Sequence, residues 1–161
     1  MARPVRVLGR SPSVLPQGPI LITSVRRTLV MQLVTETTGR SPVMAHLAYR
    51  ADDPFAVTMT FSHDGLVLAR WRLDREMLAE GIERPVGEGD VRIGPRATGI
   101  WREVRLEFFG RPHSDGGRQH AVVVGWAPAV LSFLDETHRI VAPGEERVSL
   151  DGFLADVIAG S

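Results

Sequence analysis

The chain has 161 residues, an apolar fraction of 43% and a formal net charge of zero, which is the composition of one ordinary globular domain. All 19 of its basic residues are arginines, and it has no lysine and no cysteine. These absences exclude disulfides, thiolate metal ligands, a cysteine nucleophile, a Schiff-base lysine and the lysine of a P-loop.

The first 27 residues are expected to form a separate basic arm. Residues 1–50 carry seven arginines against one acid, whereas residues 51–161 carry twelve arginines against eighteen acids. Much of the early positive charge is interleaved with four prolines, which oppose helix formation. The apolar stretch at residues 20–25 is too short for a signal peptide or a membrane span. We therefore predict a cytoplasmic chain with an irregular arm at 1–27 and a single domain at 28–161.

From residue 28 onward most segments alternate apolar and polar side chains with the period of a β-strand. The clearest case is "PFAVTMTF", which places Phe55, Val57, Met59 and Phe61 on one face. Further strands are predicted at residues 28–35, 43–49, 67–73, 100–109 and 119–126. In the strand at 100–109 we expect Ile100, Val104, Leu106 and Phe108 to point inward. Short connections such as "SHDG" favour hairpins and hence an antiparallel sheet.

Two or three helices interrupt the strands, so the fold class is α+β. The first is predicted at residues 74–81, with Asp74 as the N-cap and Gly81 ending the helix in a left-handed conformation. The second covers residues 127–139, with Pro128 in its first turn. The third lies near the end of the sequence, where apolar residues recur at helical spacing in Leu150, Phe153, Leu154, Val157 and Ile158.

A glycine-rich stretch, "PVGEGDVRIGP" at residues 85–95, invites comparison with loops that bind phosphate. Such loops follow a strand and precede a helix, so that free amides at the helix N-terminus face the anion. Here the predicted helix comes first and a strand follows. Glu88 and Asp90 would also repel a phosphate group. We interpret Gly87 and Gly89 as residues of a structural turn and expect no nucleotide or other cofactor.

Catalytic and metal-binding patterns are also weak. His113, Ser114 and Asp115 are adjacent, but triads are assembled from separate segments, so a surface turn is the better interpretation. The five histidines lack the spacing of helical zinc ligands. His63 and Asp64 belong to the predicted hairpin turn rather than to a metal site. The sequence therefore predicts a protein without enzymatic activity, without a cofactor and without a bound metal.

Nucleic-acid binding is the main alternative that the residues leave open. Arg70, Arg72 and Arg105, together with Trp71 and Trp101, would form a cationic and aromatic face for stacking single-stranded bases if they lay together. Against this, residues 51–161 are net acidic, and Trp71 alternates with the apolar set of its strand. We therefore place Trp71 in the core and treat a nucleic-acid partner as the less favoured alternative.

Several motifs occur in one order along the chain. They are "YRADDPFAVTMTF" (49–61), Trp71, "REMLAEGIERPVGEGDVRI" (75–93), "FLDETHRIVAPGEE" (133–146) and the closing "SLDGFLADVIAGS" (149–161). From about residue 28 to its last residue, the chain resembles the SsgA-like sporulation-specific cell division proteins of actinomycetes. The absence of lysine agrees with the GC-rich genomes of that group. The basic arm departs from the family pattern, in which the domain starts almost at the N-terminus.

The resemblance implies a fold of two packed antiparallel sheets with helices, similar to the whirly single-stranded-nucleic-acid-binding proteins. It also implies a non-enzymatic septum-site adaptor that engages the division protein FtsZ or an SsgA-like paralogue, as a homotrimer or another homo-oligomer. Residues at its motif positions are expected to be structural or partner-binding: Asp53, Pro54, Trp71, Gly87 and Gly89. Of these, the first two are expected to shape the entry to a strand.

Overall fold

The computed structural model describes residues 23–37 and 39–147, which form eight strands and two helices. These elements are β1 (Ser24–Thr35), β2 (Gly39–Arg50), β3 (Asp53–His63), β4 (Leu66–Asp74), α1 (Arg75–Glu83), β5 (Val86–Glu88), β6 (Val91–Thr98), β7 (Trp101–Pro112), β8 (Arg118–Trp126) and α2 (Ala127–Ile140). The architecture is α+β, as predicted. None of the described helices is long and apolar enough to cross a membrane.

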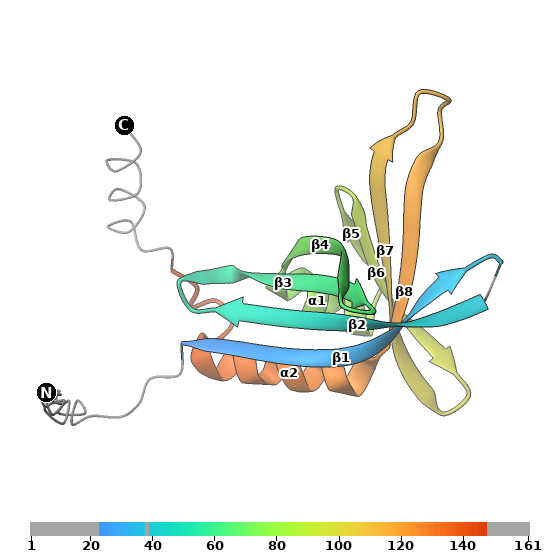
Figure 1. Ribbon diagram of the computed structural model, residues 1–161. Helices are drawn as coiled ribbons and strands as arrows, with labels where there is room; N and C mark the ends of the chain where they lie inside the picture. Colours follow the sequence, from blue (N-terminus) through green and yellow to red (C-terminus); the bar gives the residue numbers. More distant parts are fainter. Residues whose placement is uncertain (1–22, 38, 148–161) are drawn as a thin grey trace, which may run out of the picture.

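All eight strands belong to one antiparallel sheet with the order β4-β3-β2-β1-β8-β7-β6-β5. The expectation of two separate sheets needs correction, because β1 pairs with β2 along its whole length and also pairs with β8. The second pairing joins only Gln32–Val34 to Val122–Val124. This ladder divides the sheet into a first half, β1 to β4, and a second half, β5 to β8. Beyond the ladder the two halves diverge, and the β7–β8 hairpin projects away from the first half (Figure 1).

The core lies between the inner faces of the two halves and beneath both helices. Strand alternation supplies most of it, and α1 and α2 add Leu78, Ile82, Val130, Phe133 and Leu134. Aromatic rings bridge the halves: Phe108 of β7 lies 5.5 Å from Phe61 and 4.7 Å from Trp71, measured between ring centroids. The two halves therefore pack against each other although they belong to one sheet.

Three side chains depart from the predicted alternation. In the strand predicted at 67–73, alternation places Val67 on the face of Trp71 and Leu73, but Val67 is 64% exposed beside the register shift between Phe61 and Ser62. Phe55 is 46% exposed, because the pairing of β2 with β3 shifts register at Tyr49 and Arg50 and displaces the first residues of β3 from the regular pattern. Ile100 is 91% exposed. It lies in the turn between β6 and β7, next to Gly99 with its φ of 62°, and not in the strand.

The helix starts were predicted well, and one helix end was not. Asp74 caps α1 as expected, since its side chain accepts a hydrogen bond of 2.8 Å from the amide of Met77. Gly81, however, does not end the helix, which continues to Glu83. A Cβ atom on Gly81 would lie 2.3 Å from Cγ2 of Ile93, so this glycine permits close packing of α1 on β6. Pro128 stands in the first turn of α2, as predicted.

Two predictions fall wholly or mainly outside the described residues. The third helix was predicted at residues 149–160, all of which lie outside the described residues. Residues 1–22 of the predicted arm also lie outside them. The remaining part of the arm is described, and there β1 already begins at Ser24. The sheet therefore starts before residue 28, the predicted boundary of the domain.

Candidate functional site

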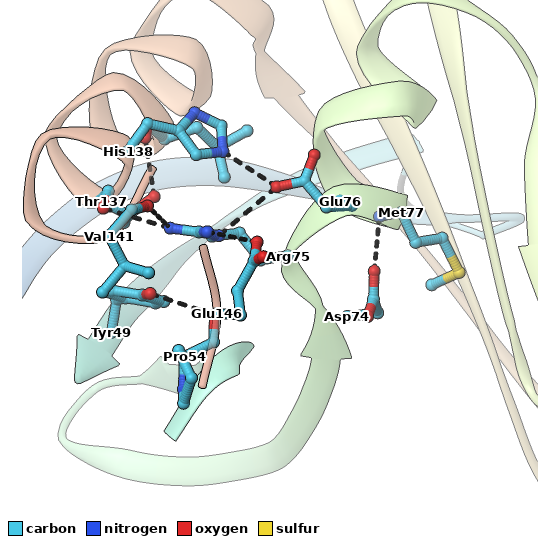
Figure 2. A network of polar contacts seen from close by, with 11 residues as sticks. Tyr49, Pro54, Asp74, Arg75, Glu76, Met77, Thr137, His138, Val141 and Glu146 are labelled. Carbon is cyan, nitrogen blue, oxygen red and sulfur yellow. Dashed lines mark hydrogen bonds and ion pairs between the residues drawn. The ribbon is translucent and has the colours of Figure 1, made fainter. Parts of the chain in front are cut away.

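Three segments that carry the sequence motifs meet around Arg75, the first residue of α1. Its side chain is completely buried. One guanidinium nitrogen donates to the carbonyl oxygens of Thr137 at 3.1 Å and Val141 at 2.7 Å, and another donates to the carboxylate of Glu146 at 2.6 Å (Figure 2). Arg75 therefore ties the start of α1 to the end of α2 and to the segment that follows it.

Tyr49 extends this network to the start of β3. The Arg75 guanidinium carbon lies 4.9 Å from the centre of the Tyr49 ring, within the range of a cation–π contact. The Tyr49 hydroxyl donates a hydrogen bond of 3.0 Å to the carbonyl oxygen of Pro54 (Figure 2). The "DP" of one motif, the helix start of the next and the "PGEE" of the third are thus joined, although they are far apart in the chain. We call Arg75, Glu146, Tyr49, Pro54 and Thr137 the Arg75 network.

The network sets the protonation of two of its members. The hydrogen bond from Arg75 is the main reason why the pKa of Glu146 lies below the ordinary value of a carboxyl group. Burial, partly opposed by the positive charge of Arg75, raises the pKa of the Tyr49 hydroxyl. Both residues are held in their usual state at neutral pH, with the carboxylate ionised and the phenol protonated.

A second contact between the helices borders the network. Glu76 accepts a bond of 3.1 Å from His138 of α2, and the same carboxylate oxygen lies 3.5 Å from Nε of Arg75. That Nε makes no hydrogen bond with any described residue. All other polar groups of the Arg75 side chain face protein acceptors. The arrangement therefore holds chain segments together and offers no open position for a substrate.

Asp53 and Trp71 lie on different faces of the first half of the sheet. Asp53 begins β3, and its carboxylate lies 2.6 Å from a guanidinium nitrogen of Arg72. Trp71 points inward, as predicted, and stacks on Phe108. It also lines an open, mainly apolar groove of about 580 Å³ between the two halves. The groove could receive apolar side chains, but it gathers no pair of acid and base groups.

The glycine-rich stretch forms the hairpin of β5 and β6, so the order required for a phosphate-binding loop is absent. Gly89 makes the turn, with a φ of 59° that favours glycine. Gly87 lies in β5 and not in the turn, where a Cβ atom would approach Cγ of Arg92 to 3.2 Å. Asp90 follows the turn and lies 2.5 Å from a guanidinium nitrogen of Arg118. The stretch connects α1 to β6 through the short strand β5, which is the order of elements that the sequence indicated.

The two histidine motifs also lie at turns, although His63 itself is the last residue of β3 and only Asp64 belongs to the turn. His113, Ser114 and Asp115 lie between β7 and β8, where the amide of His113 donates to the carbonyl oxygen of Gly117. Asp64 lies in the β3–β4 turn with a φ of 48°. Within residues 23–37 and 39–147, no three histidine, aspartate or glutamate side chains are grouped so that they could hold a metal ion.

The residues proposed for base stacking do not share one face. Arg70 and Arg72 are exposed on the outer face of β4, opposite to the inward-pointing Trp71. Arg105 and Trp101 belong to β7, in the other half of the sheet, where Arg105 contacts the carboxylate of Glu107. The structure therefore separates the cationic and aromatic groups that the alternative hypothesis required.

Sequence analysis missed the Arg75 network, although one signal was present. Arg75, Leu78 and Ile82 are three and four residues apart, so they lie on one stripe of α1. An arginine on an otherwise buried stripe indicates an internal acceptor. The identity of that acceptor, Glu146, could not be derived, because it lies in an irregular segment after α2.

Comparisons with known proteins find relatives over most of the chain. A model of the SsgA family, described as a Streptomyces sporulation and cell division protein, matches residues 43–146. Sporulation-specific cell division protein SsgB of Streptomyces coelicolor is 35% identical over 86% of this chain and 98% of its own length. SsgB of Thermobifida fusca is 35% identical over 80% of this chain and 89% of its own length.

Solved structures show the same similarity. A crystal structure of an SsgA-like sporulation-specific cell division protein from Thermobifida fusca matches with a TM-score of 0.71 and 31% identity, covering 86% of this chain and 96% of that one. An SsgB structure, from work on mutations that correlate to longitudinal cell division during sporulation of Streptomyces coelicolor, matches with a TM-score of 0.67 and 34% identity. It covers 80% of this chain and 97% of that one.

Proposed function

This chain belongs to the SsgA family of sporulation and cell division proteins, and from that premise we propose that it is a non-enzymatic adaptor at the division septum. It acts by binding the division protein FtsZ directly, or by binding an SsgA-like paralogue that reaches FtsZ. The observation that carries this proposal is the similarity to SsgB proteins over most of the chain. The relatives are named as cell division proteins, and none of these names indicates an enzyme.

The described surfaces support a role in binding and not in catalysis. The most polar buried cluster, the Arg75 network, uses its donors and acceptors internally. Large apolar side chains are exposed on several strands, among them Leu66, Val67 and Trp126. Of these, Leu66 and Val67 adjoin at the start of β4, and adjoining exposed apolar groups occur on surfaces that contact other proteins.

We further propose a cytoplasmic location at the septum and assembly as a homotrimer or another homo-oligomer. We also propose that residues 1–27 contain a basic arm, whose last residues enter β1, ahead of a single domain. Because the arm is cationic, it would attract any polyanion without a specific site. Asp53, Pro54, Trp71, Gly87 and Gly89 are proposed to act structurally, while contact between any of them and a partner remains a prediction.

Binding to FtsZ and to DNA can be compared on one preparation. We would measure co-sedimentation of the protein with FtsZ polymers, with and without an SsgA-like paralogue, and binding to single-stranded DNA across a salt series. The full chain is compared with a variant that lacks residues 1–22, which leaves β1 intact. We expect both forms to sediment with the polymers, and any DNA binding to be weak and to disappear when residues 1–22 are removed.

The competing function, single-stranded nucleic-acid binding, predicts a different pattern. Release of counterions from six to ten phosphate contacts would reduce affinity by roughly three to five powers of ten between low and moderate salt. Tight, salt-sensitive DNA binding by the form without residues 1–22, together with no association with FtsZ or a paralogue, would contradict the adaptor proposal.

A further inference from the structure

The outer face of the first four strands is covered by neither helix. Both helices pack on the inner face, whereas most outward side chains of the central parts of β1 to β4 are exposed or half-buried. Register places these side chains in rows across the strands. One row is Arg26, Ala48, Thr58 and Arg72, and the next is Thr28, His46, Thr60 and Arg70. We call these two rows, with Arg50 at the end of β2, the basic face.

The basic face has a floor of small side chains between two cationic borders. The floor consists of Ala48, Thr58 and Thr60 on the central strands, with His46 hydrogen-bonded to Thr28 and to Ser62, each at 3.0 Å. Arg26 borders it on β1, and Arg70 and Arg72 border it on β4. Three strand spacings separate the borders, or about 14 Å. At one end the surface is hollowed by about 560 Å³ beside Arg26 and Arg50.

Two of the four arginines lack a carboxylate partner among the described residues. Arg50 and Arg72 are paired with Asp52 and Asp53, at 2.5 and 2.6 Å. Arg70 makes only a long hydrogen bond of 3.3 Å to the hydroxyl of Thr60. The Arg26 side chain makes no ion pair with any described residue. The face therefore carries unpaired positive charge on both borders, which suits a negatively charged ligand long enough to reach from one border to the other.

The side chains of the floor favour a protein over a nucleic acid as the ligand of the basic face. Single-stranded nucleic acids are held by aromatic rings that stack on the bases. The two rows contain hydroxyl, methyl, imidazole and guanidinium groups but no phenylalanine, tyrosine or tryptophan. Side-chain carboxylates on a peptide can instead pair with separate guanidinium groups over a floor of hydroxyls.

We propose that the basic face binds an acidic segment of a protein partner, with carboxylates placed on Arg26 at one border and Arg70 at the other. The proposal rests on the proposed function only in taking the natural occupant to be a protein. It identifies the surface and the chemistry of the partner segment, which the family membership does not supply.

The test uses the full chain and poly-L-glutamate as a probe. In Arg26→Glu combined with Arg70→Glu, both unpaired border charges are reversed. The matched control is Arg111→Glu combined with Arg139→Glu, which changes the net charge equally at exposed positions of β7 and α2. We expect the border variant to bind poly-L-glutamate roughly tenfold more weakly than the control does at physiological ionic strength. Equal weakening in both variants, or in neither, would overturn the proposal.

Two further measurements, one with the form that lacks residues 1–22 and one with the border and control variants, separate this inference from the proposed function. Single-stranded DNA should bind more weakly than poly-L-glutamate to the form without residues 1–22, and the reverse order would overturn the acidic-peptide assignment. Co-sedimentation with FtsZ polymers or with a paralogue should decrease in the border variant and not in the control. Co-sedimentation that is unchanged in both variants would overturn the assignment of this surface while leaving the adaptor role intact.

Discussion

At the scale of single residues, the main feature is a charged side chain placed entirely inside the protein. Burial of a guanidinium group costs free energy unless partners replace its hydration, and Arg75 recovers this cost through two carbonyls, one carboxylate and an aromatic ring. Such a pair contributes less to net stability than its contacts suggest, but it favours one arrangement of the segments that it joins. The sequence contains a signal of this buried charge, an arginine on the buried stripe of α1, but no signal of the groups that satisfy it.

The lowered pKa of Glu146 predicts how stability depends on pH. A carboxyl group whose pKa is lower in the folded than in the unfolded chain stabilises the fold above its unfolded pKa, and this contribution is lost as the pH falls through the folded pKa. Glu146→Gln should therefore lower the melting temperature at pH 7. The difference from the unmodified chain should shrink as the pH falls below the ordinary carboxyl range.

Glu145→Gln is the matched control, because Glu145 is exposed and adjacent in sequence. It should leave both the melting temperature at pH 7 and its pH dependence close to those of the unmodified chain. Thermal denaturation followed by circular dichroism over a pH series measures both variants. If the loss caused by Glu146→Gln is the same at every pH, ionisation of Glu146 is not what stabilises this segment.

At the scale of elements, sequence patterns identified most strands and the starts of both described helices. Alternation succeeded because one face of each strand packs on the core, and Asp74 was recognisable because an N-cap depends on local chemistry alone. Glycines were harder to interpret. Gly81 and Gly89 have the same side chain, but Gly81 lies against β6 while Gly89 needs a positive φ. Only the packing of α1 on the sheet distinguishes the two roles.

The close approach at Gly81 predicts a destabilising substitution. In Gly81→Ala the new methyl group would meet Cγ2 of Ile93 at 2.3 Å and Cβ at 2.6 Å, so α1 or β6 must shift. Alanine gains about 1 kcal/mol of helix propensity over glycine. Overpacking typically costs roughly 1–3 kcal/mol, and two contacts below 3.0 Å place this site in the upper part of that range, so the propensity gain offsets only part of the cost. We expect a net decrease in the free energy of unfolding, measured by urea denaturation.

Gly94→Ala provides the comparison for this prediction. A Cβ atom there would come no closer than 3.7 Å to its nearest neighbour, Pro85, which is an ordinary contact. The same substitution should change the free energy of unfolding by less than about 1 kcal/mol. A Gly81→Ala variant that is as stable as the Gly94→Ala variant would show that α1 and β6 are not packed as closely as described.

At the scale of the whole molecule, the number of sheets was the largest feature that the sequence did not predict correctly. The two halves are joined by the pairing of Gln32–Val34 with Val122–Val124. A pairing of three residues leaves no recognisable pattern in the sequence, because the alternation of apolar and polar residues shows that a segment is a strand but not which strand it pairs with. The surface proposed to bind a partner was hidden for a related reason. The basic face combines residues of four strands, and only their register brings Arg26 and Arg70 to opposite borders of one surface.

The function was inferred from motif order, and the geometry shows why those motifs belong together: two of them and the start of a third supply the Arg75 network. The central claim concerns the place where the protein acts, so its position in the cell tests it most directly. We would image a fluorescent fusion of the full chain in dividing cells of its native host. The account predicts rings at the septa. Staining of the nucleoid without septal rings would contradict it.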